Sequence, residues 1–196
     1  MRYLALLLLF TLFWTTLLSS DEKIGSTFMG LNAGYLYNPT SSNIKIDKNA
    51  ASIGFEMGYR SHENIFFSFN YNRNQLDTHI YDDTYVSVNY LFDLNKPKFS
   101  VYSGILGGWS GLTWKKKDLV ELMPPSEKES SSYILGTQVG FEYTIKEDMF
   151  LYYSYIYSYT PHKTRLYNDI EVENSSRHNV MIGFRYYLYT QGKKLH

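Results

Sequence analysis

Apolar and polar residues alternate with a period of two through most of the chain after residue 26. Between Met29 and Tyr37, for example, every second residue is apolar, and Gly30, Asn32 and Gly34 stand between them. Such alternation predicts β-strands with two chemically different faces. The pattern recurs in eight segments: Thr27 to Tyr37, Ala51 to Arg60, Ile65 to Asn74, Thr84 to Phe92, Phe99 to Trp114, Tyr133 to Tyr143, Met149 to Tyr159 and Arg177 to Leu188.

The length and polarity of these segments favour a membrane barrel. Ten residues at about 3.3 Å each, tilted near 45°, rise roughly 23 Å, close to the apolar band of about 25 Å that an outer-membrane barrel presents. One face carries Tyr, Phe, Ile, Leu and Val, and the other carries Gly, Ser, Asn, Gln, Glu and Arg. A soluble eight-stranded carrier would have the opposite polarity, with its apolar face inside. We therefore predict an all-β fold, an eight-stranded antiparallel transmembrane β-barrel in up-and-down meander order, closed because backbone groups in hydrocarbon need partners.

Loop lengths support the same topology. Short connections at 61–64, 93–98 and 144–148 alternate with longer ones at 38–50, 75–83, 115–132 and 160–176. Short periplasmic turns and long external loops are usual in these barrels, and an even strand number puts both termini on the periplasmic side. Two local features remain open: Gly107-Gly108 suggests a bulge, and Pro124-Pro125 with the polar run to Ser132 suggests a mobile loop.

The first twenty residues predict export. Met1-Arg2 precedes an almost wholly apolar run from Tyr3 to Leu18, and Ser19-Ser20 and then charged residues follow. This order is typical of a signal peptide, and the run is short for a membrane-spanning helix, which needs about 20 residues. We expect a signal peptide over residues 1–20 and a barrel domain over residues 21–196, located in the outer membrane of a Gram-negative bacterium.

Composition refines this expectation. The chain has 20 Tyr, 12 Phe and no Cys, and its formal net charge is zero. The absence of cysteine excludes disulfides, and the neutral charge gives no reason to expect nucleic acid as a partner. Tyr and Trp favour the boundary between lipid and water. The aromatic residues expected at that boundary are Tyr35, Tyr59, Trp109, Trp114, Tyr157, Tyr159 and Tyr186.

Two motifs carry a resemblance to known proteins. Gly-x-x-x-Gly-Tyr occurs at 30–35 and 54–59, and the closing stretch Asn179 to Leu188 has Gly183, Tyr186 and Leu188 in the spacing of a barrel-assembly signal. In these features residues 27–188 resemble the small eight-stranded outer-membrane barrels, namely the OmpA-like transmembrane domain, opacity-type proteins and OmpW/OmpX-like proteins. The resemblance implies outer-membrane lipid and the barrel-assembly machinery as partners.

Four charged residues fall on the face predicted to line the lumen: Glu56, Arg60, Glu142 and Arg185. Because an unpaired charge in a poorly solvated interior is costly, we expect Arg185 to bridge Glu142, with Arg60 or Glu56 completing a network. The resemblance implies that such a network plugs or gates the lumen. Packing of the interior is the simpler interpretation.

No catalytic or metal-binding motif stands out. The five histidines are scattered, and His178 lies near Ser175, Ser176 and two glutamates without the His-x-Ser of lipid A deacylases. Asp77, Asp82 and Asp83 could bind Ca²⁺, although carboxylates in a solvated loop usually bind nothing. We therefore expect no enzyme, cofactor or metal.

A basic cluster suggests contact with lipopolysaccharide. Lys115, Lys116 and Lys117 follow the two tryptophans of their segment and are placed to reach lipopolysaccharide phosphates.

Three functions compete at this point. The first is a structural or surface-interaction barrel, expected to be monomeric, with a lumen plugged by polar and charged side chains. The second is a narrow OmpW-like conduit for small solutes, and the third is a lipid-modifying enzyme. The sequence does not name a ligand.

Overall fold

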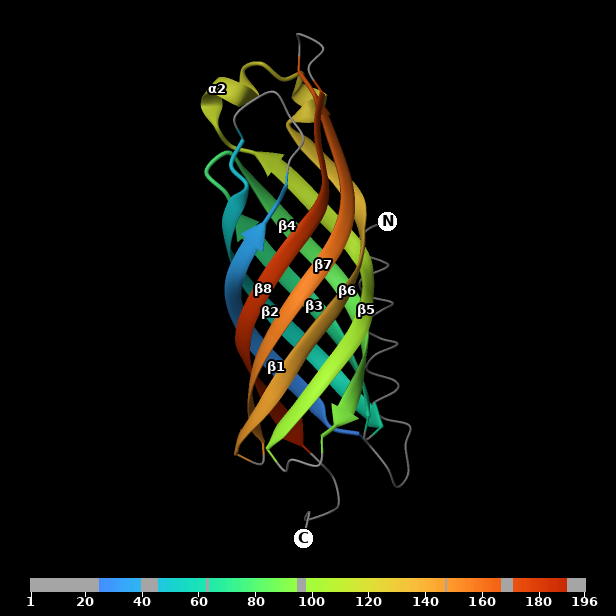
Figure 1. Cartoon of the computed structure of the whole chain (residues 1–196). Coiled ribbons are helices and arrows are strands. Elements are labelled where there is room, and N and C mark those ends of the chain that lie inside the picture. The colour runs from blue at the N-terminus through green and yellow to red at the C-terminus, as the bar shows by residue number, and fades with distance from the viewer. Residues whose placement is uncertain are drawn as a thin grey trace.

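The protein is a closed β-barrel in which eight antiparallel strands follow one another in chain order (Figure 1). The computed structural model describes residues 25–39, 46–62, 64–94, 98–146, 148–166 and 171–189. The predicted signal peptide and the tail after Tyr189 lie outside the described residues. The predicted fold class is confirmed. The strands are β1 (Thr27–Tyr37), β2 (Asn49–His62), β3 (Ile65–Gln75), β4 (His79–Asp93), β5 (Phe99–Trp114), β6 (Glu129–Lys146), β7 (Met149–Arg165) and β8 (Glu171–Tyr189).

The barrel closes where β1 pairs with β8, with Leu31 opposite Phe184 and Tyr35 opposite Val180. β1 begins and β8 ends at the same end of the barrel, which we call the turn end, and Figure 1 shows the short helix α2 (Lys117–Val120) at the other end, the cap end. No helix among the described residues is long and apolar enough to cross a membrane.

Strand phase is regular, as the two-residue alternation predicts. β5 pairs with β4 and with β6 without a register shift, so the bulge suggested at Gly107-Gly108 does not form. Gly107 faces outward, where an added Cβ would make only ordinary van der Waals contacts, the nearest at 3.5 Å, whereas Gly108 lies against the backbone of β4. The two glycines thus occupy opposite faces of one continuous strand.

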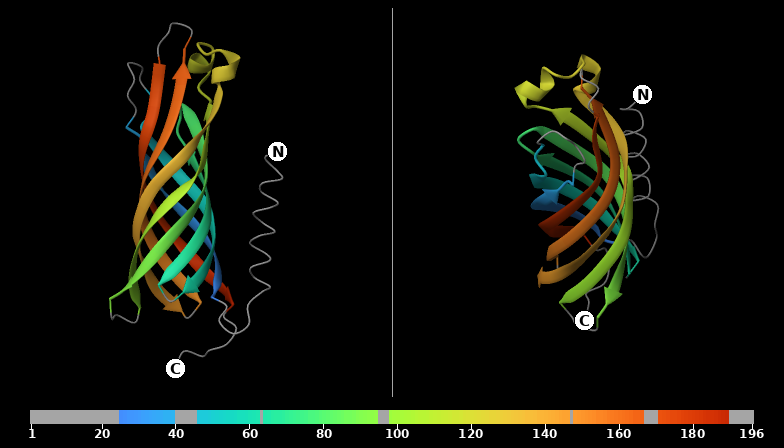
Figure 2. Two further views of the ribbon diagram at one scale, coloured as in Figure 1. Left: turned by 90° about the vertical axis from the view of Figure 1, so that its right-hand side faces the viewer. Right: turned by 45° about the horizontal axis from the view of Figure 1, so that its top comes forward.

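The strands run farther at the cap end than the alternation indicated. β4 starts at His79, β6 starts at Glu129, and the β7–β8 hairpin continues to the pair Arg165–Glu171. Most of the expected loop at 75–83 is therefore strand. The stretch after Pro124, where a mobile loop was expected, forms a 3₁₀ turn (Pro125–Glu127) and then the first residues of β6. Both views in Figure 2 show β6, β7 and β8 rising above the blue end of β1.

The outward face is apolar and the interior is filled with side chains. Leu31, Ile105 and Trp109 are among the most exposed large residues, at 66–69% of their full area. Inside, Gly140 makes room for a ring, since an added Cβ would lie 2.5 Å from the Tyr102 hydroxyl. Polar residues such as Ser87, Asn74 and Arg185 are almost fully buried. This is the inside-out polarity that the sequence predicted.

Apolar residues also fill the cap end of the interior. We call this cluster the cap; it brings together chain segments from five strands, α2 and the loops. Its buried members are Leu36, Ile46, Ala50, Leu76, Tyr81, Leu112, Trp114, Leu119, Met123, Leu166 and Val172.

Candidate functional site: the polar lumen

Arg185 of β8 is the centre of a buried ion cluster near the turn end. Its Nε donates to Glu56 Oε2 at 2.8 Å and its Nη2 to Glu56 Oε1 at 2.9 Å, a bidentate pair. Its Nη1 donates to Glu142 Oε1. All three side chains are at most 3% exposed. Two carboxylates thus hold one guanidinium, and the fork geometry of arginine fixes its orientation.

Aromatic rings surround the same guanidinium. The Arg185 Cζ atom lies 4.1 Å from the centre of the Tyr152 ring and 4.9 Å from that of Phe66, with Phe28 and Tyr102 at 5.2 and 5.3 Å. Cation–π contacts of this kind strengthen when water is excluded. Two carboxylates and four aromatic rings thus surround one guanidinium inside the barrel.

Arg60 does not join this cluster. It lies near the turn end of β2, where its backbone N–H donates to the Ser26 carbonyl, and its side chain is only half-buried. Among the described residues, the ion pairs of Glu56 and Glu142 are both with Arg185. Of the four predicted lumen charges, three therefore come together.

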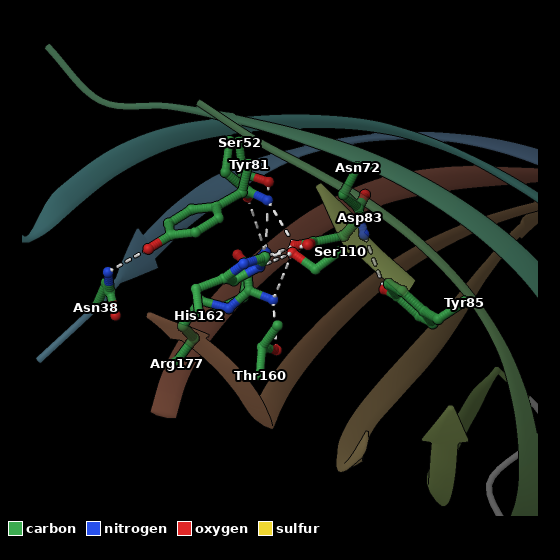
Figure 3. A network of polar contacts seen from close by, with 12 residues as sticks. Asn38, Ser52, Asn72, Tyr81, Asp83, Tyr85, Ser110, Thr160, His162 and Arg177 are labelled. Atoms are coloured by element: carbon green, nitrogen blue, oxygen red, sulfur yellow. Dashed lines mark hydrogen bonds and ion pairs between the residues drawn. The ribbon is translucent and has the colours of Figure 1, made fainter. Parts of the chain in front are cut away.

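A second buried ion cluster lies nearer the cap end (Figure 3). Arg177 Nη1 donates to both carboxylate oxygens of Asp83, at 3.0 and 3.1 Å, and Nη2 donates to Thr160 Oγ1 at 2.6 Å and Ser110 Oγ at 3.3 Å. Arg177 and Ser110 are at most 1% exposed. The Tyr81 ring covers the guanidinium from the cap side at 4.5 Å.

His162 extends this second cluster with hydroxyl contacts. Its Nε2 lies 3.1 Å from Ser110 Oγ and its Nδ1 lies 3.0 Å from Ser130 Oγ. A serine–histidine contact suggests nucleophilic catalysis, but here the second ring nitrogen faces another serine rather than a carboxylate, and Ser110 is fully buried. The arrangement therefore serves to satisfy buried polar groups.

Amide and hydroxyl side chains fill the space between the two ion clusters. Ser68 and Ser87 hydroxyls lie 2.7 Å apart, and Ser87 also accepts from Asn89 at 2.9 Å and from Gln138 at 3.2 Å. The cavity beside Arg185 at this level has a volume of about 10 Å³, room for about one water molecule. At this level, between the two ion clusters, side chains thus fill most of the described lumen.

The sequence contained a signal for the second cluster that the prediction did not use. Arg177 has the same parity as the inward residues Asn179 and Arg185, and Asp83 has that of Ser87 and Asn89. Arg177 opens the predicted eighth segment and Asp83 lies one residue before the fourth, so the strand phase already indicates that both charges face the lumen.

Six of the seven predicted interface aromatics face outward. Tyr35, Trp109, Tyr157, Tyr159 and Tyr186 are 42–69% exposed, and Tyr59 is half-exposed on the same face of β2 as Ile53.

The assignment of Trp114 to the boundary is wrong, since it is 4% exposed in the cap and its Nε1 donates to Thr164 Oγ1 at 3.1 Å. An odd separation from Trp109 on a regular strand puts the two rings on opposite faces.

The lysines predicted to contact lipopolysaccharide are exposed, whereas two of the aspartates considered for Ca²⁺ face opposite sides of β4. Lys115, Lys116 and Lys117 are exposed at the cap end of β5, where the first two donate backbone N–H groups to the Thr78 carbonyl. Asp82 faces outward, 3.7 Å from Arg73, whereas Asp83 faces inward to Arg177. Within the described segments, no three His, Asp or Glu side chains gather as metal ligands would.

Known proteins match in structure but not in sequence. No family model and no curated protein matches the chain. The crystal structure of neisserial surface protein A superposes with a TM-score of 0.63 at 19% identity, over 86% of this chain and 100% of that one. The structure of Escherichia coli outer membrane protein W superposes with a TM-score of 0.51 at 16% identity, over 86% of this chain and 100% of that one. The N-terminal barrel of Pseudomonas aeruginosa OprF superposes with a TM-score of 0.50 at 13% identity, over 84% of this chain and 100% of that one. At these identities the likeness establishes a fold, that of the small eight-stranded outer-membrane β-barrels, as the resemblance predicted.

Proposed function

We propose that the chain is a non-conducting outer-membrane barrel whose role is structural or depends on contacts made by its external end. The observation that carries this proposal is the packed lumen: the Arg185 cluster with its rings, the amide and hydroxyl layer, the Arg177 cluster and the cap follow one another along the barrel. Eight strands enclose an interior just wide enough for side chains. Such a lumen has no continuous path for solutes.

The outward face supports a membrane location. Large apolar residues, including Leu31, Ile53, Ile105 and Phe184, are more than half exposed. A continuous apolar surface of this kind is unfavourable in water and suits lipid. The residues at 1–20 supply the export signal in this proposal, and the chain would be inserted by the barrel-assembly machinery.

Membrane location is tested by fractionation and gel mobility. We expect the protein in the outer-membrane fraction, running differently on a denaturing gel before and after boiling, because a folded barrel resists unfolding in cold detergent. A mature protein that stays soluble in the periplasm without detergent would overturn the membrane assignment.

The closed lumen is tested by conductance in planar bilayers. Wild-type protein whose folding has been verified by gel mobility should give no steady openings. The alternative is a narrow conduit, as the likeness to outer membrane protein W suggests. Steady openings in wild type whose conductance changes in Arg185→Ala would establish that alternative, because they would pass through the lumen.

The external end provides a platform for contacts. In this proposal the exposed Lys115, Lys116 and Lys117 contact lipopolysaccharide phosphates, and the barrel acts as a monomer without catalytic activity. Lipid A mass spectra from deletion and overexpression strains test the last point. A change in acyl chains would show a lipid-modifying enzyme instead.

A further inference from the structure

A histidine surrounded by tyrosines lies on the outward face near the cap end. His178 of β8 stands between Tyr37 on β1 and Tyr157 on β7, which are its direct cross-strand partners. Its ring centre lies 5.2 Å from that of Tyr157 and 6.1 Å from those of Tyr37 and Tyr155. Three tyrosine rings from two neighbouring strands thus surround one imidazole.

The cluster marks the boundary of the apolar surface. Going toward the cap end, the outward residues of β8 change from Phe184, Ile182 and Val180 to His178 and then Ser176. On β7 the outward tyrosines give way to Lys163. If the apolar surface lies in hydrocarbon, as proposed above, His178 stands at the level of the lipid headgroups.

The imidazole keeps one nitrogen available. Its Nδ1 lies 2.6 Å from the Tyr155 hydroxyl, whereas Nε2 has no partner among the described side chains and is not buried. With the tyrosine donating to Nδ1, Nε2 carries the ring hydrogen, and in the imidazolium form both nitrogens carry one. Nε2 can then donate to an acceptor outside the protein.

Toward the cap end of the same cluster, β1 ends and the connection to β2 begins. The residue after Tyr37, Asn38, donates its backbone N–H to the carbonyl of Lys48, the residue directly before β2, at 2.7 Å. The opposite side of the barrel is built differently. There the boundary carries Arg73 and Tyr71, both paired with Asp82.

From this arrangement we propose that His178, Tyr37, Tyr155 and Tyr157 form a binding site for the phosphorylated sugar headgroup of an outer-leaflet glycolipid. The tyrosine faces stack against a sugar ring, and His178 Nε2 donates to a phosphate oxygen. The site lies three strands away from the lysines at 115–117, and it rests on the membrane location proposed above.

The test is native mass spectrometry of folded protein in detergent, titrated with lipid A. We expect one lipid A molecule to bind wild type, with affinity reduced about tenfold in His178→Ala, because a hydrogen bond to a charged group is lost. His178→Gln keeps a donor of similar reach and should stay within about threefold of wild type. Equal affinity in wild type and His178→Ala would overturn the proposal.

Three comparisons make the result specific. Tyr186→Leu, which removes an outward tyrosine at the turn end of the same strand, should leave affinity within about twofold, since single surface changes are usually small. If Tyr186→Leu lost as much lipid A affinity as His178→Ala does, any outward aromatic residue would contribute equally to binding, and the proposed site would be overturned. Lipid A lacking its phosphates and phosphatidylglycerol should both bind more weakly than lipid A; equal binding of either overturns recognition of a phosphorylated sugar.

Failure of this site and failure of the membrane proposal can be told apart. Every variant is first assayed for heat-modifiable mobility and outer-membrane fractionation. A protein that passes both assays but binds lipid A no better than His178→Ala rejects the site alone, whereas a protein that fails both in wild type rejects the membrane location.

Discussion

Single buried charges determine how the lumen is held together, and Arg177 is the clearest case. It is 1% exposed, and it is the ion-pair partner of Asp83 in the described chain. We predict that Arg177→Met lowers the free energy of unfolding by about 3–5 kcal/mol, because it leaves a buried carboxylate without its partner. Urea unfolding of the protein in lipid vesicles measures this.

Two further variants separate pairing from charge. The double variant Arg177→Met with Asp83→Asn should recover most of the loss, since no unpaired charge remains. Arg73→Met should cost less than about 1 kcal/mol, because the Arg73–Asp82 pair is exposed. If Arg177→Met proves as mild as Arg73→Met, the buried pair does not stabilise the lumen.

The two tryptophans of β5 give a second prediction at this scale. Trp109 is 69% exposed on the outward face and Trp114 is buried in the cap. In barrels refolded without residues 1–20, brominated lipids should quench the fluorescence strongly in Trp114→Phe, where Trp109 remains, and weakly in Trp109→Phe. The reverse order would show that β5 is inserted in the opposite phase.

At the scale of the strands, an inward glycine on one strand makes room for a large ring on the neighbouring strand, as Gly140 of β6 does for Tyr102 of β5. A Cβ at Gly140 would lie 2.3 Å from the Tyr153 carbonyl oxygen and 2.5 Å from Tyr102 atoms, whereas one at Gly107 would meet Leu135 at 3.5 Å and the Ile134 carbonyl oxygen at 3.9 Å. Gly140→Ala should therefore destabilise the barrel by about 1–3 kcal/mol through overpacking. Gly107→Ala should change it by about 0.5 kcal/mol or less. Unfolding midpoints in urea compare the two, and equal effects would contradict the packing assigned to Tyr102.

Strand identity, and the phase of every strand except β5, could be predicted from the sequence because one alternation recurs in segment after segment. The strand ends at the cap could not. There the inward residues of β4, β5 and β8 turn apolar, as Tyr81, Leu112 and Val172 show. This reversal removes the polar-inside pattern on which the prediction depended.

The lumen charges could likewise be predicted only in part. Glu56, Glu142 and Arg185 lie within the regular stretches, and their meeting was expected from phase and charge. The contact between Asp83 and Arg177 joins residues 94 positions apart across the barrel. Phase gives the face of each residue, but which charges meet across a lumen depends on strand tilt, which the sequence pattern does not specify.

For the molecule as a whole, the absence of cysteine makes orientation easy to test. Leu122 is 47% exposed at the cap end and Leu94 is 44% exposed at the turn end. A membrane-impermeant maleimide should label Leu122→Cys in intact cells, and should label Leu94→Cys only after the outer membrane is permeabilised. Labelling of Leu94→Cys alone in intact cells would mean that the barrel is inserted upside down.

The cap also makes the two ends of the barrel respond differently to cold. Along the belt, apolar side chains meet hydrocarbon, so water takes little part in holding them. In the cap, Leu36, Leu112 and Leu166 are withdrawn from water itself, as in a soluble domain. That driving force fades as temperature falls. Cooling should thus weaken the packing of the cap while the membrane-facing part of the barrel keeps its stability. The two parts of the molecule are stabilised against different solvents, water at the cap and lipid around the strands.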